Sequence, residues 1–220
     1  MQQTVSLLFS SADRERVAAA VHKAESRTSG EIVPYVVERS DTYEEAEWRC
    51  GVLLAAVTLT AFSIIYSYTR IWLPLSVAEL VIAVLLAGAL GAVVTRFLPP
   101  LKRFFAGHHQ MERRVAQRAA EAFISEEVFK TKERTGILIF LSLFERKVLV
   151  LGDAGINAKV KQDEWHDVVN RIVSGIRSKK PADGLIDGIL QCGVLLEKQG
   201  VAIRPDDKDE LSDSLRMTDR

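Results

Sequence analysis

Two apolar runs, separated by only a few residues, constrain the fold of this chain more than any other feature. Residues 51–69 contain no charged side chain, and residues 71–95 contain only Glu79. A helix of 19 residues extends over about 28 Å, close to the roughly 30 Å of a bilayer's hydrocarbon core. A buried helix of a soluble protein is rarely apolar on all sides over this length. We therefore expect residues 51–98 to form a transmembrane helical hairpin with a tight turn at 70–74.

Basic residues near the ends of the two runs predict the orientation of the hairpin. The turn carries Arg70, whereas basic residues are more numerous on the two outer flanks: Arg39, Arg49, Arg96, Lys102 and Arg103. Lys and Arg favour the cytoplasmic side of a membrane. We expect a multi-pass protein of the cell inner membrane, in contact with the lipid bilayer, whose soluble domain lies in the cytoplasm.

Glu79 is the charged residue within the second run. A carboxylate at membrane depth can mark a proton or ion path, which would fit a small transporter or channel subunit. If the helix begins near Pro74, however, Glu79 lies about one turn from its N-terminus, where a carboxylate is favourable and can reach water. We favour this second interpretation.

Small residues later in the run allow close helix packing, within the hairpin or between copies: Ala87, Gly88, Gly91 and Ala92.

The residues before the hairpin predict one helix and one strand. Residues 10–27 have the pattern of a helix, and Ser10 with Asp13 can form a capping box at its start. Residues 31–39 are rich in β-forming side chains, and Pro34 favours an edge position for this strand. One helix and one strand cannot bury a core, so they require a partner from the other side of the hairpin.

The residues after the hairpin supply that partner. We expect the following elements: a helix over 109–130, a β-hairpin of strands 137–143 and 147–152, and helices over 162–177 and 182–199. The predicted fold class is α/β, with residues 10–40 and 109–200 forming one interrupted domain. The polar residues 201–220 are expected to form a disordered tail.

Charge and motifs exclude several functions. Lys+Arg and Asp+Glu number 29 each, so the chain lacks the basic excess typical of nucleic-acid binders. Cys50 and Cys192 form no CxxC motif and indicate reduced thiols. A Cys-x5-Arg phosphatase loop is excluded because Lys198 stands at the arginine position. The sequence contains no Walker A, GxGxxG or GxSxG motif, and we predict no catalytic or cofactor-binding residue.

The loop at 152–165, between a buried strand and a helix, is the candidate site. Its oxygen-bearing side chains could coordinate a hard cation such as Ca²⁺: Asp153, Asn157, Asp163 and Glu164. An EF-hand is excluded, because Gly155 and Ala158 occupy its third and sixth positions. The alternative is that Gly155 makes the turn while Asp163 begins or caps the next helix. The candidate metal ligands are Asp153 and Asp163, together with Glu31.

Three segments resemble the TPM domain family: RTGILIFLSLFERKVLVLGDAGINAKV (134–160), DEWHDVVNRI (163–172) and ADGLIDGILQCGVLL (182–196). That family includes a thylakoid lumen protein, photosystem II repair factors, a nematode modulator of acetylcholine receptors and many bacterial membrane proteins. The chain is most similar to a bacterial, membrane-anchored branch with a hairpin inserted after the first strand. The resemblance implies a small sheet flanked by helices on both faces.

The resemblance also implies possible chemistry. In the family, acidic residues around the loop after the second hairpin strand are associated with calcium, and some plant members with a weak acid-phosphatase activity. Asp163 matches the family's aspartate at the start of the penultimate helix, and Arg146 matches the basic residue of the hairpin turn. Glu145 and Asn157 depart from the family, which has an aspartate and an acidic residue at these positions. The loss of that carboxylate at Asn157 weakens the calcium and phosphatase inferences.

Two functions follow as hypotheses. The first is a non-enzymatic, membrane-tethered module that binds a membrane protein and supports the assembly, repair or regulation of a membrane complex. The alternative is a weak, metal-dependent acid phosphatase linked to calcium, which would use Asp153, Asp163 and Glu31.

Overall fold

The computed structural model describes residues 5–68, 76–203 and 210–218. They form two compact units, each described by itself. The α/β unit consists of Met1–Asp41 and Glu112–Arg220, and the hairpin unit consists of Thr42–Met111.

A four-stranded mixed sheet organises the α/β unit, with strand order β3-β2-β1-β4. Its strands are β1 (Glu31–Val37), β2 (Gly136–Ser142), β3 (Lys147–Gly152) and β4 (Arg216–Thr218). β1 pairs in parallel with β2 along its whole length and with β4 at its end, whereas β2 and β3 form an antiparallel hairpin. The pairing of β1 with β2 joins segments from the two sides of the insertion into one sheet.

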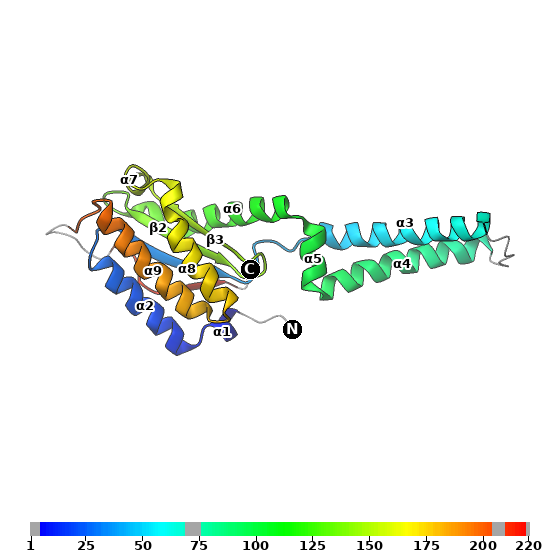
Figure 1. Cartoon of the computed structure of the whole chain (residues 1–220), viewed down its shortest axis with the longest axis horizontal. Helices are drawn as coiled ribbons and strands as arrows, with labels where there is room; N and C mark the ends of the chain where they lie inside the picture. Colours follow the sequence, from blue (N-terminus) through cyan, green and yellow to red (C-terminus); the bar gives the residue numbers. More distant parts are fainter. Residues whose placement is uncertain (1–4, 69–75, 204–209, 219–220) are drawn as a thin grey trace. The chain divides into compact units, whose positions relative to one another are not determined.

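Helices cover both faces of this sheet, which confirms the predicted fold class. The helical elements are α1 (Val5–Leu8), α2 (Ser11–Glu25), α6 (His108–Ser125), η1 (Val128–Lys130), α7 (Ala154–Asn157), η2 (Gln162–Trp165), α8 (His166–Arg177) and α9 (Pro181–Lys198). α2, α8 and α9 pack on one face, where Ile32 and Ile139 join their core, and Figure 1 shows these helices together. Val115 of α6 packs on the other face against Val33 and Phe140. Because both faces are covered, every residue of β2 is buried.

The position of β1 corrects one prediction, because β1 lies between β2 and β4 rather than at an edge. Its backbone N–H groups alternate in direction: Glu31 donates towards the β2 side, and Glu38 donates to Thr218 on the β4 side. Pro34 has the same parity as Glu38, so its missing N–H would face the β4 side. β4 pairs only with Tyr35–Val37, so no ladder bond is lost at Pro34.

The end of the chain differs from the disordered tail predicted for residues 201–220. Among the described residues there, Arg216–Thr218 form β4, and Leu215 is buried in the main core. Residues 204–209 and 219–220 lie outside the described part of the chain. The segment is polar on average but contains a few apolar residues. The edge of β1 that does not pair with β2 was open, and β4 pairs there.

The hairpin unit contains α3 (Glu44–Tyr68), α4 (Val77–Phe97) and α5 (Pro99–Ala106). α3 and α4 lie side by side in Figure 1 and are long and apolar enough to cross a membrane. Most of their side chains are exposed, unlike those of a core helix in a soluble protein. The turn predicted at 70–74, including Pro74, lies outside the described residues.

Small residues bring α3 and α4 into close contact. A Cβ atom added to Gly51 would lie 2.8 Å from the carbonyl oxygen of Gly88, and one added to Gly91 would lie 3.2 Å from the Cα atom of Gly51. The small-residue spacing predicted from the sequence therefore serves packing within the hairpin.

Glu79 lies in the first turn of α4, as the favoured interpretation of the sequence predicts. Its Oε2 atom accepts a hydrogen bond of 2.7 Å from the N–H of Ser76, and its own N–H donates to Ser76 Oγ at 3.2 Å. This capping box satisfies N–H groups at the start of α4 that have no partner within the helix. The carboxylate therefore has a structural role at the end of the helix.

Candidate functional site

Two buried carboxylates lie at one end of the sheet, on either side of β2. Glu31 is the first residue of β1 and stands in register with Gly136, the first residue of β2. Asp153 follows the last residue of β3, and its N–H donates to the carbonyl oxygen of Gly136 at 2.9 Å. Both residues are only 6% exposed. The structure thus brings these two sequence-predicted residues to one sheet end.

The two oxygens of the Asp153 carboxylate differ, because Oδ1 accepts hydrogen bonds whereas Oδ2 contacts Arg134 without a hydrogen bond. Oδ1 accepts from the N–H of Ala154 at 2.7 Å and from Arg134 Nη2 at 3.1 Å, while Oδ2 lies 2.7 Å from Arg134 Nε. The first contact caps α7, and the guanidinium supplies the opposite charge that a buried carboxylate requires. Arg134 also lies over the ring of Phe129, 5.8 Å from its centroid.

The other two predicted metal ligands have different surroundings. Glu31 accepts a hydrogen bond of 3.3 Å from the N–H of Leu211, in the segment before β4. Asp163 is exposed in η2. The carboxylate that caps η2 belongs to its neighbour Glu164, whose Oε2 accepts from the N–H of Lys161 at 2.8 Å. Among the described residues, no hydrogen bond or ion pair joins Asp163 to either buried carboxylate.

The described part of the chain contains no group of three His, Cys, Asp or Glu side chains that could hold a metal ion. A divalent cation at Asp153 would meet the guanidinium of Arg134, a like charge already bound there. Asn157 donates from Nδ2 to the carbonyl oxygen of Gly152 at 2.6 Å, a donor role that a carboxylate cannot take. The calcium site therefore stays a prediction from the sequence.

Gly155 has a different role from the turn proposed for it. It lies within α7, and a Cβ atom there would be 2.3 Å from the carbonyl oxygen of Glu133. Its N–H donates to the carbonyl oxygen of Arg134 at 2.9 Å. Glycine is therefore needed for the close approach of two backbone segments beside Asp153.

Cys192 lies fully buried in α9. Burial, and secondarily the charge of Glu25, raises the pKa of its thiol far above the ordinary value. Burial and the raised pKa both disfavour the thiolate, which is the nucleophilic form of cysteine.

The turn between β2 and β3 holds a buried polar network that the sequence did not indicate. Glu145 accepts hydrogen bonds from the N–H of Ser40, at 2.9 Å, and from the hydroxyl of Ser142. The hydroxyl of Ser40 donates to Ser142 Oγ at 3.0 Å. Sequence reasoning noted Glu145 only as a departure from the family. Its partner Ser40 lies 105 positions away, so no local pattern could reveal the network.

The same end of the α/β unit holds both chain segments that flank the hairpin unit. Asp41, at the outgoing segment, pairs with Arg114 of α6 at 2.7 Å. Glu112, at the returning segment, pairs with Lys147 of β3 at 2.8 Å. Together with the Glu145 network, these contacts bring both ends of the insertion together on the α/β unit.

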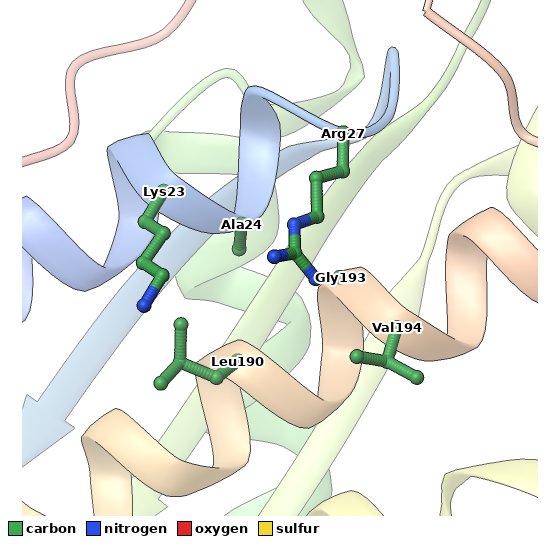
Figure 2. Close-up of a pocket in the computed structure, with 6 residues that line it drawn as sticks. All are labelled: Lys23, Ala24, Arg27, Leu190, Gly193 and Val194. Atoms are coloured by element: carbon green, nitrogen blue, oxygen red, sulfur yellow. The ribbon is translucent and has the colours of Figure 1, made fainter.

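A groove between α2 and α9 is a second candidate site (Figure 2). It has a volume of about 130 Å³ and is lined by Lys23, Ala24, Arg27, Leu190, Gly193 and Val194. Gly193 lets the helices approach closely, because a Cβ atom there would lie 2.9 Å from the Cβ atom of Ala24. Lys23 and Arg27 border an apolar floor, so the groove suits an acidic group next to an apolar one. Sequence reasoning missed this groove because it depends on the pairing of two distant helices.

Comparisons with known proteins agree with this architecture. The model of the TPM domain family matches residues 105–194, which confirms the resemblance for that part of the chain. The structure is similar to the NMR structure of the BA42 protein from the psychrophilic bacterium Bizionia argentinensis sp. nov., with a TM-score of 0.59 and 19% sequence identity over 99% of this chain and 100% of that one. At this identity the likeness concerns the fold alone. No curated protein matches the chain significantly.

Proposed function

We propose that this chain, whose residues 105–194 match the TPM domain, is a membrane-tethered module of the cell inner membrane. In this proposal α3 and α4 cross the bilayer, and the α/β unit lies on the cytoplasmic side. There it binds a membrane protein and supports the assembly, repair or regulation of a membrane complex.

The observation that carries the proposal is the pairing of β1 with β2 across the insertion. β1 precedes the apolar hairpin and β2 follows it, yet they pair over seven residues, from Glu31 with Gly136 to Val37 with Ser142. Both flanks must therefore lie on one side of any membrane that the hairpin enters. Two antiparallel spans meet this requirement, and the basic residues of the flanks favour the cytoplasm.

Reporter fusions test the tether. A reporter that is active only outside the cytoplasm should be active when fused at Arg70 and inactive when fused at the C-terminus, and a cytoplasmic fluorescent reporter should give the reverse pattern. The same compartment for both fusion sites would contradict two membrane spans.

The groove between α2 and α9 is the surface that we propose for the partner. A photo-crosslinking residue in place of Val194, in native membranes, should form a defined adduct with a membrane protein. The charge-reversing substitutions Lys23→Glu and Arg27→Glu should remove this adduct, because they oppose an acidic group at the groove. A crosslinker at the exposed Leu7 of α1 is the matched control. Equal capture from both positions would contradict a specific site.

Phosphatase activity is the second candidate, and the buried carboxylates Glu31 and Asp153 at one sheet end favour it. The purified chain, assayed on phosphomonoesters with and without Ca²⁺, should then release phosphate. Asp153→Asn and Asp163→Asn should each lower the rate. If the wild type is active and both folded variants are not, phosphatase activity would replace the interaction module as the leading function. If the wild type and the two variants give equal rates, the phosphatase hypothesis would be rejected.

A further inference from the structure

Large aromatic side chains are exposed at both ends of the hairpin unit. At one end, Trp48 of α3, Phe97 of α4 and Phe104 of α5 are 72%, 73% and 77% exposed. At the other end of α3, Tyr66 and Tyr68 are 68% and 84% exposed. The large exposed apolar side chains between these two groups, among the described residues of α3 and α4, are all aliphatic.

The distance between the two groups corresponds to the apolar thickness of a membrane. Trp48 and Tyr68 are 20 positions apart along α3, which places them roughly 30 Å apart at 1.5 Å per residue. The hydrocarbon core of a bilayer is also roughly 30 Å thick. Trp and Tyr collect at the two membrane–water interfaces, where one part of the ring system is apolar and the other polar.

Charged groups beside Trp48 are compensated by α5. Arg49 is the next residue of α3, and its Nη1 atom donates to the carbonyl oxygens of Phe105 and Ala106, at 2.9 and 3.3 Å. These carbonyls end α5 and have no later N–H in the helix to bind them. A cation at this negative helix end is favourable, and the side chain is directed away from the apolar part of the hairpin.

A second charge pair fixes α5 to the base of the hairpin. Lys102 Nζ lies 2.7 Å from Glu47 Oε1, and the two side chains are only 10% and 17% exposed. α5 lies across the end of the α3–α4 pair in Figure 1. Lys102 and Ala106 of α5 are buried, whereas Phe104, about 200° around the helix from Lys102, is exposed.

We infer that Trp48, Phe97 and Phe104 form an aromatic collar that holds α5 in the headgroup region of a lipid bilayer, opposite the surface reached by Tyr66 and Tyr68. The inference rests on the proposed membrane tether and adds to it the depth of the hairpin and the orientation of α5 along the membrane surface. The exposed Arg96, next to Phe97 at the end of α4, complements the lipid phosphates. The occupant of this surface is lipid, because the collar continues the apolar exposed surface of α3 and α4.

Spin labels at single cysteines test the depth of the collar. The full chain carries Cys50→Ala, and Cys192 is left in place because it is fully buried. Labels are attached through Phe104→Cys, Leu85→Cys in the apolar part of α4, or Leu7→Cys in the α/β unit. The chain is reconstituted in phosphatidylcholine–phosphatidylglycerol vesicles, and collisions with oxygen are compared with collisions with a water-soluble nickel chelate.

The oxygen preference should be strongest at Leu85, intermediate at Phe104 and absent at Leu7. If the label at Phe104 shows as little oxygen preference as the label at Leu7, or as much as the label at Leu85, the collar would be overturned. The tether would stay intact in both cases. A label at Leu85 that behaves like the one at Leu7 would overturn the tether itself, and the collar with it.

Trp48 provides a second measurement that does not depend on the labelled variants. In a Trp72→Phe chain, whose remaining tryptophans are Trp48 and the buried Trp165, lipids brominated near the headgroup should quench fluorescence more than lipids brominated near the chain end. Adding Trp48→Phe should remove this difference. Preferential quenching from the chain end, lost in the same variant, would contradict the collar, as would equal quenching by both lipids.

Discussion

Ser10 and Asp13 bond reciprocally at the start of α2. The N–H of Asp13 donates to Ser10 Oγ at 3.1 Å, and the carboxylate of Asp13 accepts from the N–H of Ser10 at 3.2 Å. The hydrogen bond from the Ser10 side chain is the main cause that lowers the pKa of Asp13, and Arg16 adds a smaller effect. This capping box is the one that the sequence predicts.

The lowered pKa of Asp13 makes the stability of α2 depend on pH. Because the folded pKa lies below the unfolded one, the stabilisation is complete above the unfolded value and is lost as pH falls through the folded value. Asp13→Asn should therefore lower the free energy of unfolding at pH 7, by at most about 1 kcal/mol near the surface. Urea unfolding of the full chain in detergent should show this difference shrinking in acid. Glu15→Gln, at an exposed position of the same helix, is the control for loss of a charge, and an equal pH dependence in both variants would contradict the assignment.

Glu145 should matter more, because its partners are buried. Glu145→Ala leaves the N–H of Ser40 and the hydroxyl of Ser142 without this acceptor, which should cost about 1–3 kcal/mol of unfolding free energy. Glu121→Ala removes a half-exposed carboxylate that pairs with Arg118 at 3.3 Å, and should change stability by less than about 1 kcal/mol. Thermal or urea unfolding compares the two variants. Similar losses would show that the Glu145 network does not stabilise the fold.

At the scale of elements, α3 and α4 pack closely because the glycines at their contact have no side chain. Gly51→Leu should force the helices apart, because even its Cβ atom would lie 2.8 Å from the backbone oxygen of Gly88. We expect a loss of about 1–3 kcal/mol, measured as a lower melting temperature in detergent. Ala56→Leu places the same side chain on the exposed side of α3 and should leave the melting temperature nearly unchanged. Equal effects of the two substitutions would contradict close packing at Gly51.

The strands show which features of an element a local pattern can predict. Alternating and continuous apolar residues predict β1, β2 and β3 close to their observed bounds, because side-chain periodicity is a local property. β4 has three residues, too few to form a pattern. The edge position expected from Pro34 was wrong, because the pairing depends on which neighbour the missing N–H faces.

At the scale of the whole molecule, the described residues that form the hydrophobic cores of the α/β unit all lie outside Thr42–Met111. Replacing residues 42–107 by a short Gly–Ser linker should therefore leave a protein that is soluble without detergent and unfolds cooperatively. The pairing of Asp41 with Arg114 at 2.7 Å shows that a short linker can join the two ends. Circular dichroism during thermal unfolding provides the measurement.

A chain that begins at residue 108 is the matched control for this replacement. It keeps β2 and β3 but lacks α2 and β1, so the edge of β2 and the core residues that pack against α2 and β1 would be exposed. We expect it to aggregate or to unfold without cooperativity. If the linker protein behaved in the same way, the α/β unit would need the hairpin unit for its stability.

The sequence by itself determined the properties that short segments carry: two apolar helices of membrane length, the capping box of α2 and the order of the longer helices and strands. These follow from covalent periodicity and from side chains a few positions apart, as in the placement of Glu79 in the first turn of α4. The candidate residues Glu31 and Asp153 were also chosen from the sequence, although not for the sheet end that they share.

Only the tertiary structure decided which distant groups meet. Four features join residues that no short window contains: the pairing of Asp153 with Arg134, the network around Glu145, the groove at Lys23 and the place of β4 in the sheet. These contacts contribute free energy only when the chain is packed and water is excluded. The same residue types can therefore be paired and buried in one fold and exposed in another.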